Sequence, residues 1–433
     1  MADSFTVLIV GGGGREHALG WKFAQDPRIK KICFAPGNAG TAEIGTNLPI
    51  PVSDVAGITA WAKGEKPGLV VVGPEAPLCE GLADQLRSIG CRVFGPGAAG
   101  AQLEGSKSFC KDLLVSQNIP TARAGSFSGM KEAVRFSETL ACPQVVKADG
   151  LAAGKGVVIA QTHTEAARAI QEMMGDRVFG DAGAKVLIEE FLPGEELSVH
   201  AVTDGRNLVI LPGAQDHKRV GEGDRGLNTG GMGAYAPAPQ ATPELLQEVK
   251  EKVLLPILAG LAARGIDYRG VLYAGLMLTP QGPKVLEFNC RFGDPETEVL
   301  LPLLDSPLWE LLASAADGDL GKISFKTRPG AAMTVVLAAP GYPERPVFGQ
   351  KISMADPSPD SAVFHAGTRK GRQGVEVAGG RVLAVTGWGK DLQAARERAY
   401  AAVGGICFTG MHFRRDIGHR ALGKTGDSVR VAS

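Results

Sequence analysis

The chain has 433 residues, of which 44% are hydrophobic and 21% charged, and its formal net charge is zero. This length predicts roughly three domains of ~150 residues with full cores. The balanced charge gives no electrostatic reason to expect nucleic acid or an anionic membrane as a partner. No signal-peptide pattern and no run of about 18 apolar residues occurs, so no segment is expected to cross a membrane. The seven cysteines are scattered without a CxxC pair, which favours reduced thiols and a cytoplasmic protein over a zinc site or a disulfide framework.

Residues 1–103 alternate short apolar runs with helical patterns, which predicts a parallel, doubly wound sheet as an N-terminal α/β domain. The expected strands are residues 5–10, 31–35, 69–72 and 92–94, and the expected helices are residues 16–23 and 79–88. Ligands of such sheets bind at the carboxyl ends of the strands. Three of these ends carry the sequences GGGGREH, PGNAG and GPEAP.

The GGGGREH segment follows a strand and begins a helix, a position where backbone N–H groups bind anions. It departs from a dinucleotide-binding fingerprint, because Glu16 stands where the third glycine belongs and no acidic residue follows the second strand. We therefore expect a sugar phosphate, with the backbone of Gly13 and Gly14 on the phosphate and Glu16, Asn38 and Glu75 on hydroxyl or amine groups. NAD binding and a purely structural tight turn are the alternatives.

A second unit is expected over residues 104–328, with an antiparallel α+β block near residues 121–192 that could move as a lid. Its KADGLAAGKG loop is not a Walker A loop, because the glycine spacing is one residue short and Gly156 replaces the Ser or Thr that would hold Mg²⁺. The loop can still cover phosphates through Lys147 and Lys155. A solvated hairpin with lysines is the alternative.

The segment KVLIEEFLPGEELSV crosses from a strand into a Pro-Gly turn. Such a crossing leaves backbone groups near Glu190 and Leu192 free to pair with an adenine edge, and Glu196 could accept from ribose hydroxyls. An ordinary acidic hairpin is the alternative. Further on, AQDHKRVGEGDRGLNTGGMGAY is expected to be an ordered functional loop. No second histidine lies at metal spacing from His217, so a zinc site is not expected there.

Residues 287–298 read EFNCRFGDPETE and follow an apolar run. Alternation along a strand places Glu287, Asn289 and Arg291 on one face. A carboxylate and an amide oxygen suit Mg²⁺, and an arginine fork suits phosphate oxygens, so the segment predicts a metal–nucleotide site. A solvated acidic loop after an edge strand is the alternative. Residues 329–433 read as a separate small α+β domain.

Together these segments resemble the ATP-grasp carboxylate–amine ligases, and more closely the glycinamide ribonucleotide synthetase family. The resemblance rests on motifs that occur in order from residue 11 to residue 421: GGREHAL, APGNAGT, VGPEAPL, AQLEGSK, KADGLAAGKGV, IEEFLPGEE, QDHKRV, NTGGMGAY, LYAGLM, EFNCRFGDPE, VFHAGT and FRRDIGHRA. Each motif is moderately specific, and the ordered set is very specific.

The resemblance implies ATP-dependent ligation of glycine to 5-phosphoribosylamine through glycyl phosphate, an early step of purine synthesis, with Mg²⁺ or Mn²⁺. Phosphoryl transfer needs positioning and charge neutralisation, which Lys107, Lys147, Lys155 and Arg291 would supply beside the metal ligands Glu287 and Asn289. The other implied roles are adenine binding by Glu189, Glu190 and Leu192, ribose binding by Glu196, sugar-phosphate binding aided by Arg414, and glycine binding near Asp216 and Asp294.

The wider ATP-grasp pattern has another acidic metal ligand one strand earlier, and GLML at residues 275–278 offers none. We expect a monofunctional enzyme that is a monomer, with a dimer as the alternative. The alternative functions are another ATP-grasp ligase or carboxylase, or a nucleotide-binding protein without turnover.

Overall fold

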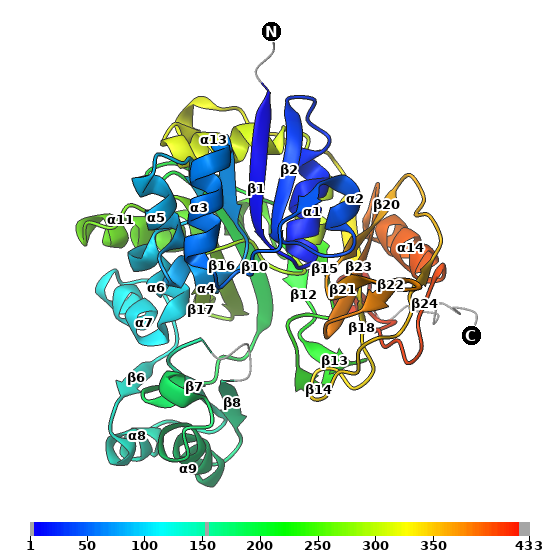
Figure 1. Ribbon diagram of the computed structural model, residues 1–433. Coiled ribbons are helices and arrows are strands. Elements are labelled where there is room, and N and C mark those ends of the chain that lie inside the picture. Colours follow the sequence, from blue (N-terminus) through cyan, green and yellow to red (C-terminus); the bar gives the residue numbers. More distant parts are fainter. Residues whose placement is uncertain (1–3, 152–155, 424–433) are drawn as a thin grey trace.

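The computed structural model describes residues 4–151 and 156–423 (Figure 1). Its N-terminal sheet is parallel, with strand order β3-β2-β1-β4-β5. The strands are β1 (Phe5–Gly11), β2 (Ile29–Pro36), β3 (Thr46–Asn47), β4 (Leu69–Val72) and β5 (Val93–Phe94), and the helices are α1 (Gly14–Phe23), α2 (Thr41–Ile44), α3 (Val55–Glu65), α4 (Glu75–Cys79) and α5 (Leu82–Ser88). Residues Val7 to Val10 of β1 are fully buried, which explains their continuous apolar run. The predicted doubly wound sheet is confirmed.

A small antiparallel sheet of order β6-β9-β7-β8 forms a second body, which we call the β6–β9 block (residues 124–190). It contains β6 (Ala124–Phe127), α8 (Met130–Ser137), β7 (Gln144–Ala148), β8 (Val157–Ala160), α9 (His163–Ile170) and β9 (Val186–Glu190). Helices α6 (Ala98–Gly105) and α7 (Lys107–Ser116) lead into it, and the Ser106 side chain caps α7 by accepting the Phe109 N–H at 3.2 Å. The block has its own apolar core, and it projects away from the rest of the molecule (Figure 1).

The central sheet is antiparallel, with order β11-β10-β16-β17. Its strands are β10 (Glu195–Thr203), β11 (Leu208–Ile210), β16 (Gly270–Thr279) and β17 (Gly282–Asn289), and α10 (Pro243–Val249), α11 (Leu255–Ala263), α12 (Thr297–Leu300) and α13 (Leu308–Asp317) accompany it. The register between β16 and β17 shifts at Gly275, so that Leu286 is an extra residue on β17. Such a bulge re-aims side chains, and here it lies directly before Glu287.

The last sheet has order β12-β15-β18-β23-β20. It comprises β12 (Gln215–Asp216), β15 (Gly233–Ala236), β18 (Ala331–Ala338), β20 (Ser361–His365) and β23 (Arg381–Gly389), with α14 (Leu392–Val403) packed on it. The small pairs are β13 (Arg219–Gly221) with β14 (Arg225–Asn228), β19 (Ser353–Met354) with β24 (Ile406–Cys407), and β21 (Thr368–Gly371) with β22 (Gly374–Val377); α15 (His419–Leu422) follows. Strand β15 comes before the boundary expected at residue 328 and β18 comes after it, yet the two strands are paired. The last sheet therefore contains strands from both sides of the expected boundary.

Within the described ranges 4–151 and 156–423, no helix is long and apolar enough to span a bilayer. The glycine-rich strand ends of the N-terminal sheet approach one another closely. A Cβ on Gly12 would lie 2.5 Å from the Gly37 carbonyl oxygen, and a Cβ on Gly73 would collide with the buried Glu16 carboxylate and lie 2.8 Å from the Val10 carbonyl oxygen. Glycine is therefore required at these positions by contact between the strand ends.

We expect Gly73→Ala to lower the free energy of unfolding by about 1–3 kcal/mol, because the added methyl group meets a buried carboxylate and backbone that cannot move aside. Denaturant unfolding measures the change. Gly64→Ala is the matched control: Gly64 lies exposed in α3 with open space at its Cβ, so this change should stabilise by about 0.5–1 kcal/mol. Equal effects at both positions would contradict this account of the strand ends.

Candidate active site

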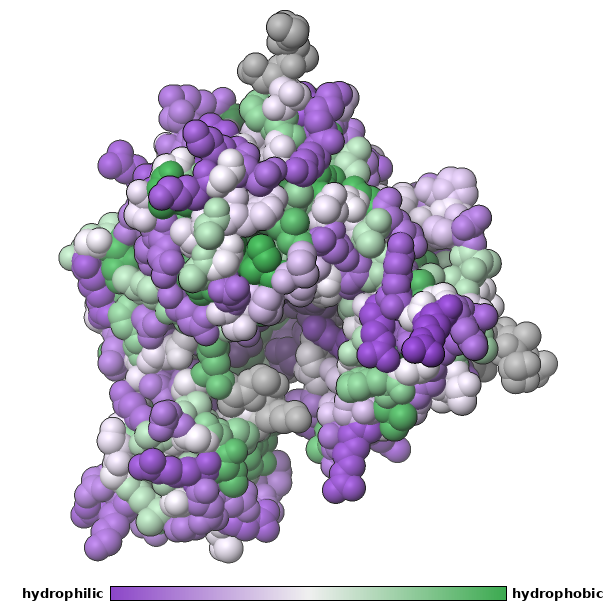
Figure 2. Space-filling model, viewed as in Figure 1, coloured by the Kyte–Doolittle hydropathy of each residue, from purple (hydrophilic) through white to green (hydrophobic). Residues whose placement is uncertain are grey.

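A cleft of about 510 Å³ lies where the N-terminal sheet, the β6–β9 block, the central sheet and the last sheet meet. Figure 2 shows the molecule hollowed between the β6–β9 block and the β13–β14 side. The charged residues that line the cleft are Arg15, Glu75, Glu104, Lys107, Lys111, Lys147, Glu189, Asp216, Lys218, Glu287, Arg291, Asp294, Glu296 and Arg381. Seven are acidic and seven are basic, so the site's chemistry depends on how these charges are paired.

Glu287 and Asn289 line one wall from the end of β17. The Asn289 side-chain oxygen accepts from Arg291 at 3.2 Å. The Glu287 carboxylate is exposed to the cleft and has neither a hydrogen bond nor an ion pair with any described residue. A free carboxylate beside an amide oxygen is a donor set that fits a divalent cation, so the chemistry of this pair agrees with the predicted metal site.

Lysines face this pair from two elements. Lys107, at the start of α7, donates to the Gly150 carbonyl at 3.1 Å, and burial lowers its pKa. Lys147 on β7 forms an ion pair with Glu189 at 2.5 Å; burial alone would lower the Lys147 pKa, but Glu189 raises it. Glu189 also pairs with Lys111 at 2.6 Å. Glu189 therefore holds two lysines in place. Lys155 lies outside the described residues.

The strand crossing predicted for adenine has the expected free backbone. Neither peptide group of Leu192 is hydrogen-bonded to another described residue, and the Leu192 side chain packs with Ala122, Met277 and Leu286 in a small apolar cluster. By contrast, the Glu190 carboxylate accepts the Arg123 N–H at 3.0 Å, and the Glu190 N–H donates to the Arg123 carbonyl at 3.0 Å. Of the two positions predicted for the adenine edge, Leu192 therefore has free backbone groups, whereas the Glu190 N–H is already bonded.

Alternation along and after β12 sends Asp216 and Lys218 into the cleft and His217 to the opposite side. Lys218 forms a short ion pair with Glu196. Burial alone would raise the Glu196 pKa, but the Lys218 ammonium keeps it below its usual value. Glu196 is thus already engaged by a lysine. The sequence analysis noted the charged QDHKR run without assigning Lys218; its spacing of two from Asp216 was the available signal.

The N-terminal sheet contributes fewer site residues than predicted. Glu75 and Arg15 line the cleft, whereas Gly13, Gly14, Glu16 and Asn38 do not. Glu16 is buried, accepts the Gly13 N–H at 2.6 Å and pairs with Arg15 at 2.5 Å. Because glycine leaves space above the loop, this carboxylate folds back and occupies the helix start itself. The Gly13 N–H, one of the two backbone groups predicted for the phosphate, is therefore occupied by the protein's own side chain.

The side-chain amide of Asn38 is likewise fully hydrogen-bonded within the fold. Its amide donates to the Gly12 carbonyl at 3.0 Å and to the His365 carbonyl at 2.6 Å, and its oxygen accepts the N–H groups of Gly40 and Thr41. This side chain joins two strand ends to the last sheet and has no remaining group to offer a sugar.

Arginines close the cleft at the junction of the sheets. Arg291 pairs with Glu104 at 2.8 Å and with Glu75 at 3.4 Å. Arg381, which the sequence analysis missed, pairs with Asp294 at 3.1 Å. No local pattern marks Arg381, because its partner lies 87 residues earlier in the chain.

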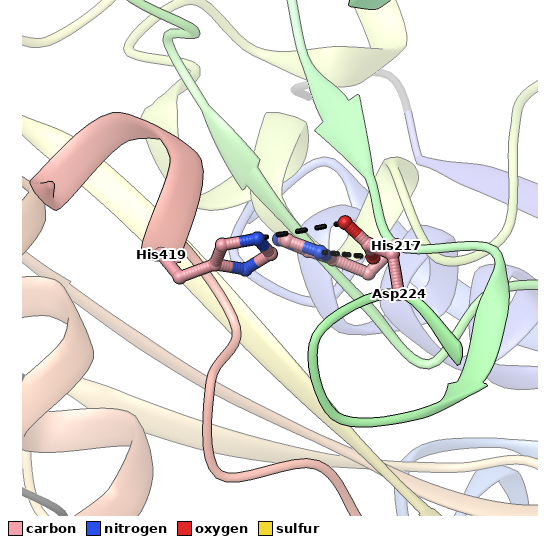
Figure 3. A group of neighbouring side chains, drawn as sticks. All are labelled: His217, Asp224 and His419. Carbon is pink, nitrogen blue, oxygen red and sulfur yellow. Dashed lines mark ion pairs between the residues drawn. The ribbon is translucent and has the colours of Figure 1, made fainter. Parts of the chain in front are cut away.

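Arg414 does not line the cleft. It is fully buried and pairs with Asp224 at 2.9 Å and Asp416 at 2.8 Å. These contacts belong to a cluster on the outer side of β12, where His217, Asp224 and His419 come together (Figure 3). His217 and His419 are 202 positions apart in the sequence. The sequence analysis looked for a second histidine only at short spacing from His217, so it could not predict that the two side chains lie close together.

The cluster is an ion-pair centre and not a good cation site. Asp224 already receives Arg414 at 2.9 Å and Arg420 at 2.7 Å, and two guanidinium groups would repel a metal ion. Burial lowers the His217 pKa to about 4; its Nε2 accepts the Gly418 N–H at 3.0 Å, so the neutral ring carries its proton on Nδ1, 3.7 Å from Asp224. The cluster fastens the C-terminal segment to the loop that carries Lys218.

We expect Asp224→Asn to lower the free energy of unfolding by about 2–3 kcal/mol, because it leaves the buried Arg414 with one carboxylate fewer. Despite burial, His217, Arg420 and Arg414 hold the Asp224 pKa well below its usual value. The stabilisation is therefore present at neutral pH and is lost as the pH falls below about 4. Thermal and denaturant unfolding at pH 7 and pH 3.5 measure both effects.

Asp360→Asn is the control, since it removes an exposed pair with Arg398 and should cost less than about 1 kcal/mol. A rise in wild-type melting temperature on adding Zn²⁺, abolished by Asp224→Asn, would instead support a metal centre in this cluster.

A small antiparallel block set against a second antiparallel sheet, with lysines on one side and a carboxylate–amide pair on the other, defines an ATP-grasp enzyme. Family models of phosphoribosylglycinamide synthetase match in order: the N domain at residues 5–104, the ATP-grasp (A) domain at residues 105–297 and the C domain at residues 332–420. The chain therefore belongs to the phosphoribosylglycinamide synthetase family.

Individual relatives agree. A phosphoribosylamine–glycine ligase of Allochromatium vinosum is 50% identical over 96% of this chain and 99% of its own length. A trifunctional purine biosynthetic protein of Gallus gallus is 49% identical over 98% of this chain and 42% of its own length. The crystal structure of the Thermotoga maritima phosphoribosylamine–glycine ligase superposes with a TM-score of 0.80 at 36% identity, covering 95% of this chain and 99% of that chain. Biotin carboxylase domains share the fold alone, for example one from Hydrogenobacter thermophilus at 17% identity and a TM-score of 0.72. The family, fold class and ligase class predicted from the sequence are confirmed, as is the use of ATP with a divalent metal.

Proposed function

We propose that this cleft carries out the ligation of glycine to 5-phosphoribosylamine, with conversion of ATP to ADP and phosphate, as a step of purine biosynthesis. The observation that supports it is the meeting in one cleft of the unpaired Glu287, Asn289, four lysines and the charged residues of the N-terminal domain. The match of the N domain favours this reaction over that of another ATP-grasp ligase or carboxylase.

In the first step the glycine carboxylate attacks the γ-phosphate of ATP, the bond to the β-phosphate oxygen breaks, and glycyl phosphate and ADP are formed. Lys107, Lys147 and Lys218 neutralise the phosphate oxygens, and Glu189 and Glu196 hold two of these lysines in position. Glu287 and Asn289 would hold Mg²⁺ or Mn²⁺, which supplies further charge neutralisation at the transferring phosphate. Arg291 acts from the base of the cleft, and Lys155 is proposed to cover the phosphates from its loop.

The nucleotide base is proposed to lie at Leu192, with its edge on the free peptide groups there and its face on the apolar cluster. Glu189 is proposed to act here by positioning Lys111 and Lys147, and Glu190 by accepting the backbone N–H of Arg123, which precedes β6. Glu196 is proposed to bind the ribose hydroxyls. It would do so either beside its present contact with Lys218 or in exchange for that contact.

In the second step the amine of phosphoribosylamine attacks the acyl carbon and phosphate leaves. The available polar groups on that side are Glu75 and Arg15 from the N-terminal sheet and Arg381 with Asp294 from the opposite side. We propose that they bind the sugar phosphate, with glycine between Asp216 and Asp294. Gly13, Gly14, Glu16 and Asn38 shape this wall from behind, and Arg414 supports the loop that carries Lys218.

We further propose domain boundaries near residues 103 and 328, a lid near residues 121–192, a cytoplasmic location and a monomeric state. All seven cysteines are free thiols, which suits a reducing compartment. Size-exclusion chromatography with light scattering distinguishes a monomer from a dimer.

The deciding experiment is ADP formation by the purified protein with a panel of amino acids, each with and without phosphoribosylamine. We expect turnover with glycine and phosphoribosylamine together. Turnover with a different carboxylate or amine would indicate another ATP-grasp ligase or carboxylase. ATP binding without any ADP release would indicate a nucleotide-binding protein.

We expect Glu287→Gln to fold normally and to lower kcat about a hundredfold or more, because the amide keeps the volume and removes the only carboxylate of the metal pair. Steady-state ADP release at saturating Mg²⁺ measures the loss. Glu344→Gln, an exposed change in the last domain, is the control and should leave kcat unchanged. Near-normal turnover of Glu287→Gln would remove Glu287 from the metal site.

We expect the β6–β9 block to close over the nucleotide, because it has a separate apolar core and carries Lys147. A non-hydrolysable ATP analogue with Mg²⁺ should slow protease cleavage within residues 145–191 at least several-fold, whereas cleavage within residues 341–360 should not change. Equal cleavage of the block with and without the analogue would contradict a nucleotide-dependent lid.

A further inference from the structure

One fully buried carboxyl group, that of Glu298, has no part in the reaction proposed above. Glu298 is the second residue of α12, and its side chain does not line the cleft. Within the described ranges 4–151 and 156–423, neither of its oxygens has a hydrogen-bond partner on another residue, and no ion pair reaches it. A carboxylate in such a place is costly, because burial removes its water and no other group replaces it.

The Glu298 carboxyl group lies against the start of α1. A Cβ on Gly14 would lie 2.5 Å from Glu298 Oε1, so only glycine leaves room for this group in its position. The contact accounts for a glycine of the GGGGREH segment that does not line the cleft. On its other sides α12 packs against β15, β18 and β23. Glu298 therefore lies at the junction of the N-terminal domain and the last sheet.

Three charged groups face Glu298, and none of them pairs with it. Arg381 of β23 pairs with Asp294 at 3.1 Å, and Arg15 of α1 pairs with the next residue of that helix at 2.5 Å. Asp294 is a like charge for Glu298. The other ionisable side chains of α1 bond elsewhere: Glu16 to Gly13 and Arg15, His17 to His365, and Lys22 to Leu304. The remaining elements packed on α12 carry no carboxyl, amino, guanidinium or imidazole group: β15, β18 and the turn Leu301–Leu303.

The two acids at this junction are held in different states. At Asp294, Arg381 and Arg15 outweigh burial and keep the pKa below its usual value. At Glu298, burial raises the pKa well above its usual value, and the Asp294 charge adds to the rise although Arg381 and Arg15 oppose it. One acid thus carries the charge and the other carries the proton, as is usual for neighbouring carboxyl groups in a buried site.

We propose that Glu298 is a neutral carboxylic acid in the working enzyme and that it is a positioning residue for the sugar phosphate. Because it adds no negative charge, Arg15 and Arg381 are each opposed by one carboxylate, and the junction has no net charge. An ionised Glu298 would make the junction negative, repel the phosphate group and compete with Asp294 for Arg381. The inference rests on the proposed binding of the sugar phosphate at this wall and adds a residue behind it.

Unfolding equilibria measured against pH test the protonation state. Glu298→Gln has the shape of the neutral acid and cannot ionise. The native carboxyl group keeps its proton at pH values where the unfolded chain has lost it, so the wild type loses stability relative to the variant as the pH rises above about 4. We expect the ratio of the wild-type unfolding constant to that of the variant to rise about tenfold per pH unit between about pH 5.5 and 7.5.

Glu43→Gln is the matched control, because Glu43 is exposed on α2 and has no ion pair with a described residue. The same ratio for this variant should change by less than about twofold over the range, since an exposed carboxyl group has nearly the same pKa in both states. A ratio for Glu298→Gln that is independent of pH, or that falls, overturns the inference.

Infrared difference spectroscopy is a second readout, independent of stability. A protonated carboxyl group has a C=O stretching band that a carboxylate lacks, so the wild-type spectrum minus that of Glu298→Gln at pH 7.5 should contain one such band. Absence of the band overturns the inference. If Glu298→Gln does not fold, Glu298→Met, which has a similar length and no charge, replaces it in both measurements. Failure of both variants to fold at pH 7.5 shows that a carboxylate is required and also overturns the inference.

Steady-state ADP release tests the positioning role. Between pH 7 and pH 9.5 we expect the KM for phosphoribosylamine to rise at least threefold more in the wild type than in Glu298→Gln, because ionisation of Glu298 places a negative charge behind the phosphate. The KM for ATP should depend on pH equally in both enzymes. Equal pH dependence of the phosphoribosylamine KM overturns the positioning role. A wild type that forms no ADP with glycine and phosphoribosylamine refutes the proposed ligation itself, while the unfolding and infrared measurements still decide the state of Glu298.

Discussion

The cleft depends on one partly buried guanidinium group, that of Arg291. Arg291 reaches Glu104 near the end of α6 and Glu75 at the start of α4, so a single side chain ties the N-terminal domain to the end of the central sheet. Burial raises the Glu104 pKa in spite of Arg291, whereas at Glu75 burial is outweighed by Arg291, a backbone hydrogen bond and Arg15 together, which lower the pKa. Loss of Arg291 would leave the buried Glu104 carboxylate without its counter-charge, at a cost of about 3–5 kcal/mol. This wall is therefore rigid.

The opposite wall is organised by the two-residue period of one short strand. Asp216 and Lys218 face the ligands, and His217 between them faces the cluster formed by Asp224 and the C-terminal segment. The same three residues therefore connect the catalytic cleft to an ion-pair centre on the outside of the sheet. Because backbone and side chains are fixed on both sides, the position of Lys218 is set before any ligand arrives, which is the condition for effective charge stabilisation.

The sequence could predict what depends on local pattern. The apolar runs located the strands of the N-terminal sheet, and the alternation along the strand predicted that Glu287 and Asn289 lie together, as they do on the cleft wall, although the bulge at Leu286 that aims them has no sequence signature. Side-chain contacts between residues that are far apart in the sequence could not be predicted. Glu16 and Asn38 carry groups suited to a sugar, yet the loops beside them use every one of those groups. Arg381 and Arg414 look alike in sequence, and only the fold sends the first into the cleft and the second into the buried cluster.

The pairing of charges also explains how one cleft accepts both anionic and cationic ligands. Lys147 and Lys218 each have a glutamate partner, so they remain extended and ordered without collapsing onto the free acids, and phosphate oxygens can add to their remaining N–H donors. Glu287 and Asp216 have no ion-pair partner among the described residues, so these two acids of the cleft are open to positively charged groups. Since Lys218 lies within electrostatic reach of both, its positive charge offsets the repulsion between these two acids.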